Sequence, residues 1–131
     1  MVFGVFDGVH EGHRAFFREA KTHGDYLIAV LTKDEIVEKL KKHKPKFSFA
    51  RRTEELEKMD GVDEVVASDA ELGTYGVVLQ HKPDIIAFGY DQAEFKKDLE
   101  KNYEKFSWKP KIVVLSAHEP EKYKSSLLNK R

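Results

Sequence analysis

A Rossmann-like, doubly wound α/β fold is predicted for this chain of 131 residues, with a parallel sheet of about five strands. Short apolar runs alternate with amphipathic segments along the whole sequence. This alternation is typical of parallel strands joined by right-handed helical crossovers. The length suits one domain with one hydrophobic core, so residues 1–131 are expected to form a single domain.

The predicted strands are short apolar runs bounded by charged or turn residues. The clearest is the continuous run YLIAVL, which is typical of a strand covered on both faces. In chain order, the predicted strands are Met1–Phe6, Tyr26–Leu31, Val62–Ala67, Ile85–Phe88 and Ile112–Leu115.

The predicted helices carry apolar residues at intervals of three and four. Glu11–Thr22 has this pattern, and His23 and Gly24 end it. Pro45 and the lack of a helical period predict a loop over His43–Ala50. The other predicted helices are Lys33–Lys41, Arg51–Met59, Gly73–His81, Ala93–Phe106 and one that begins at Ser125 and extends to Lys130.

The composition excludes several classes of function. Lysine and arginine total 23, as do aspartate and glutamate, so the formal net charge is zero. This balance argues against a nucleic-acid or membrane partner. The absence of cysteine excludes disulfides, thiolate metal sites and cysteine nucleophiles. The chain has no long apolar run and no secretory leader, so we expect a cytoplasmic protein.

The loop after the first predicted strand carries the strongest functional signal, GVFDGVHEGH from Gly4. Ligands of doubly wound sheets bind beyond the carboxyl ends of the strands. His10 and His13 share one face of a helix, and Gly12 lets a ligand approach the backbone. Because a helix N-terminus also favours anions, this loop predicts a triphosphate site. Surface or capping histidines are the alternative, and no third metal ligand is evident nearby.

A cationic loop, defined here as residues 39–52, follows the second predicted strand. Its cations are Lys39, Lys41, Lys42, Lys44, Lys46, Arg51 and Arg52, and no acidic residue lies between them. Residues 54–71 reverse the sign with eight acidic residues against Lys58. Such a loop can neutralise phosphates, whereas the alternative is a solvated run of charge. Pro45, Phe47 and Phe49 restrict or anchor the loop and favour the first interpretation.

Two later segments offer further nucleotide contacts. In IIAFGYDQ, Gly89 lets a base or ribose approach the backbone, and Asp91 can accept hydrogen bonds from a ribose or a ring amine. Ser125 and Ser126 open the last predicted helix and can bind phosphate oxygens. An ordinary turn and an ordinary helix cap are the respective alternatives.

The first loop resembles the signature of the nucleotidylyltransferase superfamily that includes the cytidylyltransferases, H-x-G-H after G-x-F-D. The matching residues are Gly4, Phe6, Asp7, His10, Gly12 and His13. The loop is also similar to the adenylyltransferase half of bacterial flavin-nucleotide synthases. The layout of the chain resembles small glycerol-phosphate cytidylyltransferases and archaeal-type FAD synthases. The resemblance implies transfer of CMP or AMP from CTP or ATP to a phosphorylated small molecule, with release of pyrophosphate and a requirement for Mg²⁺.

The resemblance also implies roles for individual residues. His10, His13, Lys44 and Arg52 would be catalytic, with Lys46 and Arg51 as second choices one step of register away. The nucleotide-binding residues would be Gly4, Phe6, Asp7, Gly12, Gly89, Asp91, Ser125 and Ser126. Mg²⁺ would be bound mainly by substrate phosphates, so no residue is assigned as a metal ligand.

Two features bear on the choice of substrate. The GYDQ segment looks most like FAD-synthase-like members, and residues 117–120 (AHEP) stand where glycerol-phosphate cytidylyltransferases carry Arg-Thr-Glu-Gly. These features keep adenylyl transfer to FMN, as in FAD synthases, open beside cytidylyl transfer. A non-catalytic nucleotide-binding module is the competing class, and the intact HxGH argues against it. Many family members are homodimers, and this sequence neither supports nor opposes that state.

Overall fold

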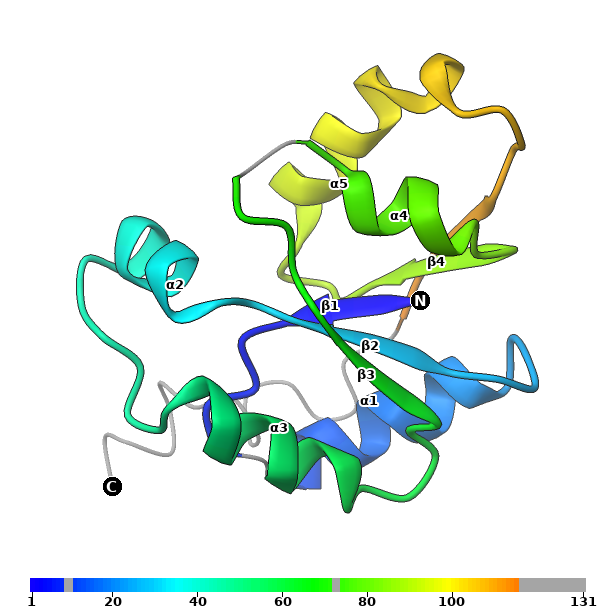
Figure 1. Ribbon diagram of the computed structural model, residues 1–131. Coiled ribbons are helices and arrows are strands. Elements are labelled where there is room, and N and C mark those ends of the chain that lie inside the picture. Colours follow the sequence, from blue (N-terminus) through cyan, green and yellow to red (C-terminus); the bar gives the residue numbers. More distant parts are fainter. Residues whose placement is uncertain (9–10, 72–73, 116–131) are drawn as a thin grey trace.

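Short parallel strands form the centre of the computed structural model, which describes residues 1–8, 11–71 and 74–115 (Figure 1). One sheet has the order β1 (Val2–Gly4), β2 (Ile28–Leu31) and β3 (Glu64–Ala67). A second sheet pairs β4 (Ile85–Phe88) with β5 (Lys111–Val114). All of these pairings are parallel, so the carboxyl ends of the strands lie on one side.

The two sheets meet where β1 lies beside β4. The Met1 nitrogen donates a hydrogen bond to the Ile85 carbonyl at 2.8 Å, and the Ala87 amide donates to the Met1 carbonyl at 3.0 Å. The spatial order is therefore β3-β2-β1-β4-β5, which confirms the doubly wound parallel prediction. The strands do not form one continuous sheet, however, because they are divided into a sheet of three strands and a sheet of two. The strand order reverses between β1 and β4, the place where such folds bind ligands.

Helices cover both faces of this strand layer (Figure 1). In chain order they are α1 (Glu11–Lys21), α2 (Asp34–Lys41), α3 (Phe49–Glu57), α4 (Gly76–His81) and α5 (Ala93–Lys101), and a 3-10 turn follows at Tyr103–Lys105. Residues of α1 and α3 share one buried cluster, and residues of α4 and α5 share the other. The helix α2 lies beyond the carboxyl end of β2, on the side of the expected ligand site (Figure 1).

The strand layer separates two hydrophobic cores. Phe17 and Leu56 are fully buried on the α1 and α3 side, while Phe88 and Leu99 are fully buried on the α4 and α5 side. Full burial of one such side chain contributes roughly 1.5–3 kcal/mol. These two cores fix the strands whose ends form the site.

The predicted elements are confirmed in type within the described residues, but some of their boundaries differ. The strand β1 ends at Gly4 because Phe6 adopts a left-handed conformation with φ 48°. The helix α3 begins at Phe49 because the Ser48 hydroxyl caps it and accepts a hydrogen bond from the Arg51 amide at 3.2 Å. The predicted helix from Ser125 lies outside the described residues.

Other boundaries shift by a few residues. The helix α4 begins at Gly76 and β3 at Glu64, both later than the sequence predicts. The helical prediction over Ala93–Phe106 divides into α5 and the 3-10 turn. In the part of the chain that the structure describes, no helix has both the length and the hydropathy needed to cross a bilayer.

Candidate functional site

Phe6 shapes the loop at the carboxyl end of β1. Its ring lies so close to Gly4 that a Cβ atom there would come within 2.6 Å of the ring. A side chain at this position would therefore have to displace the buried Phe6 ring. The Phe6 ring also meets the His13 imidazole edge to face, with centroids 5.5 Å apart at 75°. Phe6 thus links the predicted nucleotide-binding glycine to one of the two predicted catalytic histidines.

Asp7 joins this first loop to the cationic loop. Its carboxylate oxygens accept hydrogen bonds from the backbone amides of Lys46 at 2.7 Å and Phe47 at 3.0 Å. A carboxylate that accepts backbone amides holds a loop in place without using any side chain of that loop. The structure therefore brings the predicted residue Asp7 together with the segment that carries the predicted phosphate-binding lysine.

Arg52 is the buried centre of the same region, with 1% of its surface exposed. Its guanidinium donates hydrogen bonds to the carbonyls of Phe47 at 3.1 Å, Val5 at 2.9 Å and Thr32 at 2.8 Å. It also forms an ion pair with the Asp34 carboxylate at 2.5 Å. A charge buried this deeply requires such complete pairing. Arg52 consequently fastens together the ends of β1 and β2, the start of α2 and the cationic loop.

Other candidate cations of this loop are on the surface. Lys44 and Lys46 are exposed. Arg51 is exposed as well, and its guanidinium bonds to Glu55 at 3.2 Å and lies 5.4 Å from the Phe47 ring centroid. Because the described partners of Arg52 are protein groups, its direct contact with phosphate stays a prediction, as does that of Lys44.

The turn after β4 lies against β1 and α1. Gly89 is buried and Asp91 is exposed. A Cβ atom at Gly89 would lie 3.1 Å from the Asp91 carboxylate and 3.4 Å from the Phe16 ring. The Gln92 side chain bonds to both the Gly89 amide and the Phe3 carbonyl. The predicted nucleoside segment is therefore held beside the strand that leads into the first loop.

Several polar residues at these strand ends were missed by the sequence reasoning. They are Thr32, Asp34, Ser68, Asp69 and Gln92. Ser68 accepts a hydrogen bond from the Lys33 amide at 3.0 Å, and Asp69 accepts one from the Val77 amide at 2.9 Å. The sequence does carry a signal for these residues. Each polar side chain follows an apolar strand within a few residues, which is where the ligands of parallel sheets bind.

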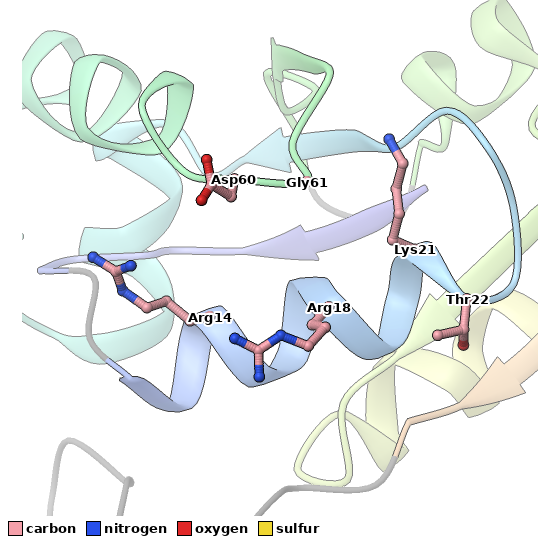
Figure 2. Close-up of a pocket in the computed structure, with 6 residues that line it drawn as sticks. All are labelled: Arg14, Arg18, Lys21, Thr22, Asp60 and Gly61. Carbon is pink, nitrogen blue, oxygen red and sulfur yellow. The ribbon is translucent and has the colours of Figure 1, made fainter.

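A separate basic cavity of about 330 Å³ lies between α1 and the turn after α3 (Figure 2). It is lined by Arg14, Arg18, Lys21, Thr22, Asp60 and Gly61. Lys21 is already ion-paired with Asp63. None of the predicted site residues lines this cavity, so it is distinct from the strand-end site.

Three predicted site residues, His10, Ser125 and Ser126, lie outside the described residues. Within the described ranges, no group of three or more histidine, aspartate or glutamate side chains could hold a metal ion. The arrangement that the structure does provide is a loop-lined edge with His13, exposed lysines and a buried arginine anchor.

Comparison with known proteins identifies the family of this chain. The family model described as Cytidylyltransferase-like matches residues 1–131. An FAD synthase of Aciduliprofundum boonei is 40% identical over 129 residues, covering 98% of this chain and 82% of the relative. An FAD synthase of Thermoplasma acidophilum is 30% identical over 131 residues, covering 100% of this chain and 91% of the relative.

The fold has a solved counterpart. The structure described as the lipopolysaccharide core biosynthesis protein from Thermoplasma volcanium superposes with a TM-score of 0.82 at 30% identity, covering 91% of this chain and 96% of the other. The family match and the relatives extend over the strand ends and loops described above. This chain belongs to the cytidylyltransferase-like family and is a nucleotidyltransferase.

Proposed function

We propose that this protein transfers AMP from ATP to the phosphate of FMN, forming FAD and releasing pyrophosphate. The observation that carries this choice is the similarity to an archaeal FAD synthase over 98% of the chain. The GYDQ segment after β4 supports the same choice. The nucleotide would lie at the β1–β4 switch point, where doubly wound folds bind their ligands.

The reaction is an in-line displacement at the α-phosphorus of ATP. An FMN phosphate oxygen forms the new bond while the bond to the bridging oxygen of the β-phosphate breaks, and pyrophosphate leaves. A phosphate monoester is largely ionised at neutral pH, so no strong general base is required. Catalysis then depends mainly on positioning and on neutralisation of charge.

Each of the predicted catalytic residues has a proposed role in this step. His10 and His13 stabilise the five-coordinate α-phosphorus, and Lys44 neutralises the triphosphate and the departing pyrophosphate. The hydrogen bonds of Asp7 to the cationic loop support the placement of Lys44. Arg52 is also proposed to neutralise the phosphates. In addition, it holds the ends of β1 and β2 in place through hydrogen bonds to their backbone carbonyls.

Other predicted residues would bind the rest of the nucleotide. Gly89 and Asp91 hold the nucleoside, while Ser125 and Ser126 hold the distal phosphates. The remaining contacts belong to the first loop, through Gly4, Phe6, Asp7 and Gly12.

Mg²⁺ is proposed to be held mainly by the substrate phosphates. Both Asp7 oxygens accept a backbone amide and retain further lone pairs. A single carboxylate beside substrate phosphates fits the usual coordination of Mg²⁺, which keeps several of its waters. When bound, the ion neutralises phosphate charge.

We also propose that the protein acts in the cytoplasm on small molecules, without a nucleic-acid or membrane partner. The formal net charge of zero supports this part of the proposal. Many family members are homodimers. Sedimentation analysis of the purified protein would show whether this chain also forms a homodimer.

The test measures pyrophosphate release with ATP or CTP and with FMN, glycerol 3-phosphate or no acceptor. We expect release only with ATP and FMN, and FAD as the product by chromatography. Release with CTP and glycerol 3-phosphate would instead assign cytidylyl transfer. Nucleotide binding without pyrophosphate release from any pair would indicate a non-catalytic binding module.

A further inference from the structure

The carboxamide of Gln92 lies between backbone groups of β1 and the turn after β4. Its Oε1 accepts a hydrogen bond from the Gly89 amide at 2.8 Å, and its Nε2 donates to the Phe3 carbonyl at 2.9 Å. Both distances are typical of well-formed hydrogen bonds. One side chain therefore bridges the two strand ends at the switch point.

The register of β1 against β4 shows what this carboxamide replaces. Met1 donates to the Ile85 carbonyl and accepts from the Ala87 amide, which makes Ile86 its partner in a parallel ladder. Two residues further on, the Phe3 and Phe88 rings stack with centroids 6.2 Å apart. In such a ladder the Phe3 amide would donate next to the Ala87 carbonyl, and the Gly89 amide would then donate to the Phe3 carbonyl.

The Gln92 carboxamide takes the place of the bond between Gly89 and Phe3. It accepts from the Gly89 amide and donates to the Phe3 carbonyl. The two backbone groups are separated by a carboxamide and two hydrogen bonds, instead of by one hydrogen bond. Neither group is left without a partner, so the opening avoids the cost of a buried unsatisfied amide. The bridge lies where β1 and β4 separate into different sheets among the described strands.

Capping of α5 does not explain this conformation. Gln92 occupies the N-cap position of α5, but its side chain makes no hydrogen bond to the helix. Only its backbone carbonyl serves the helix, by accepting the Lys96 amide at 3.0 Å. The side chain is directed to the strands.

We propose that Gln92 is a positioning residue that keeps the ends of β1 and β4 apart and orients the Gly89–Asp91 turn toward the nucleoside. This inference rests on the proposed function, because that function assigns the turn to nucleoside binding. Removing the carboxamide lets the Gly89 amide bond directly to the Phe3 carbonyl. The two strand ends then move together and gain a direct backbone hydrogen bond.

The test compares Gln92→Ala and Gln92→Glu with the wild type, and uses Gln80→Ala as a matched control. Gln80 is exposed on α4 and is the other glutamine of the chain. The readouts are the affinity for α,β-methylene-ATP by calorimetry, KM and kcat for ATP and FMN, and the midpoint of thermal unfolding. A misplacement of about 1 Å can cost on the order of a hundredfold in rate.

For Gln92→Ala we expect kcat/KM for ATP to fall roughly tenfold to a hundredfold. Analogue affinity should fall with it, whereas KM for FMN and the unfolding midpoint stay near the wild-type values. Gln92→Glu should weaken nucleotide binding too, because its carboxylate accepts the Gly89 amide but cannot donate to the Phe3 carbonyl. Gln80→Ala should match the wild type.

Unchanged analogue affinity in Gln92→Ala would overturn the inference. Parallel losses of stability and of affinity for both substrates would also overturn it, since they would mark Gln92 as merely structural. Should Gln92→Ala fail to fold, Gln92→Asn carries the same test, because its shorter side chain cannot span both partners. Analogue binding without turnover by the wild type would refute the proposed function alone, and no analogue binding would refute both.

Discussion

The buried guanidinium of Arg52 is paired with the carboxylate of Asp34 at the start of α2. The two partners differ in solvent exposure: the Arg52 side chain is fully buried, whereas 40% of the Asp34 side chain is exposed. Arg52 also binds the backbone carbonyls at the ends of β1 and β2. Residues 18 positions apart thus fix the strand ends from which both site loops leave.

Replacing Arg52 should destabilise the whole domain. Arg52→Ala removes a fully buried side chain and its hydrogen bonds to three backbone carbonyls. Hydrogen bonds to a charged group typically contribute about 1.5–3 kcal/mol each. We expect a loss of unfolding free energy on that scale by urea denaturation, and a much smaller loss for the neighbouring exposed Arg51→Ala. Equal, small losses for both variants would contradict the anchoring role.

His13→Ala should lower turnover without unfolding the protein. Loss of one contact that stabilises transition-state charge typically costs roughly a hundredfold to a thousandfold in kcat. His13 is half-buried at the start of α1 and packs against Phe6, so truncation should change the thermal midpoint little. The measurement is pyrophosphate release under saturating ATP and FMN. His23→Ala, two residues after the end of α1, is the control, and near-wild-type activity of His13→Ala would remove His13 from the mechanism.

The two exposed lysines of the cationic loop should differ in their effect. Lys44→Ala is expected to lower kcat/KM about as much as loss of His13, roughly a hundredfold or more. Lys46→Ala should cost much less, because the described anchor at Lys46 is its backbone amide, which the substitution keeps. Steady-state kinetics of both variants decide which lysine binds phosphate. A larger loss of kcat/KM for Lys46→Ala than for Lys44→Ala would assign that role to Lys46.

The strands and helices could be predicted because their signal is local. Apolar runs such as Tyr26–Leu31 and the helical spacing around Phe17 reflect burial that each segment requires by itself. The role of Arg52 could not be read in this way, because its partners are carbonyls of residues 5, 32 and 47. A cationic run looks the same whether its members face solvent or the interior, so the sequence predicted Arg52 as a phosphate-neutralising residue and gave no sign of its burial.

The division of the sheet was also beyond the sequence. Beside this division the Gln92 side chain bonds to the carbonyl of Phe3, 89 residues away in the sequence, and no periodicity encodes such a contact. The residue types at the site were easier to predict than their partners. Asp7 was recognised in its motif, but its bonds to the Lys46 and Phe47 amides follow from how two loops meet.

Asp63 should make stability depend on pH in acid. Its carboxylate accepts hydrogen bonds from the Lys21 ammonium group and from the Leu27 amide, and these hold its pKa below the ordinary value of 3.8. A group whose pKa is depressed by folding stabilises the folded state fully above its unfolded pKa, and that contribution is lost as the pH falls through the folded pKa. Between neutral pH and about pH 5 the contribution should be constant, and below about pH 4 it should decline. Urea unfolding of the wild type and Asp63→Asn across this range measures it: the stability difference between them should shrink as the pH falls, and a difference that stays constant down to pH 2 would contradict the ion pair's contribution.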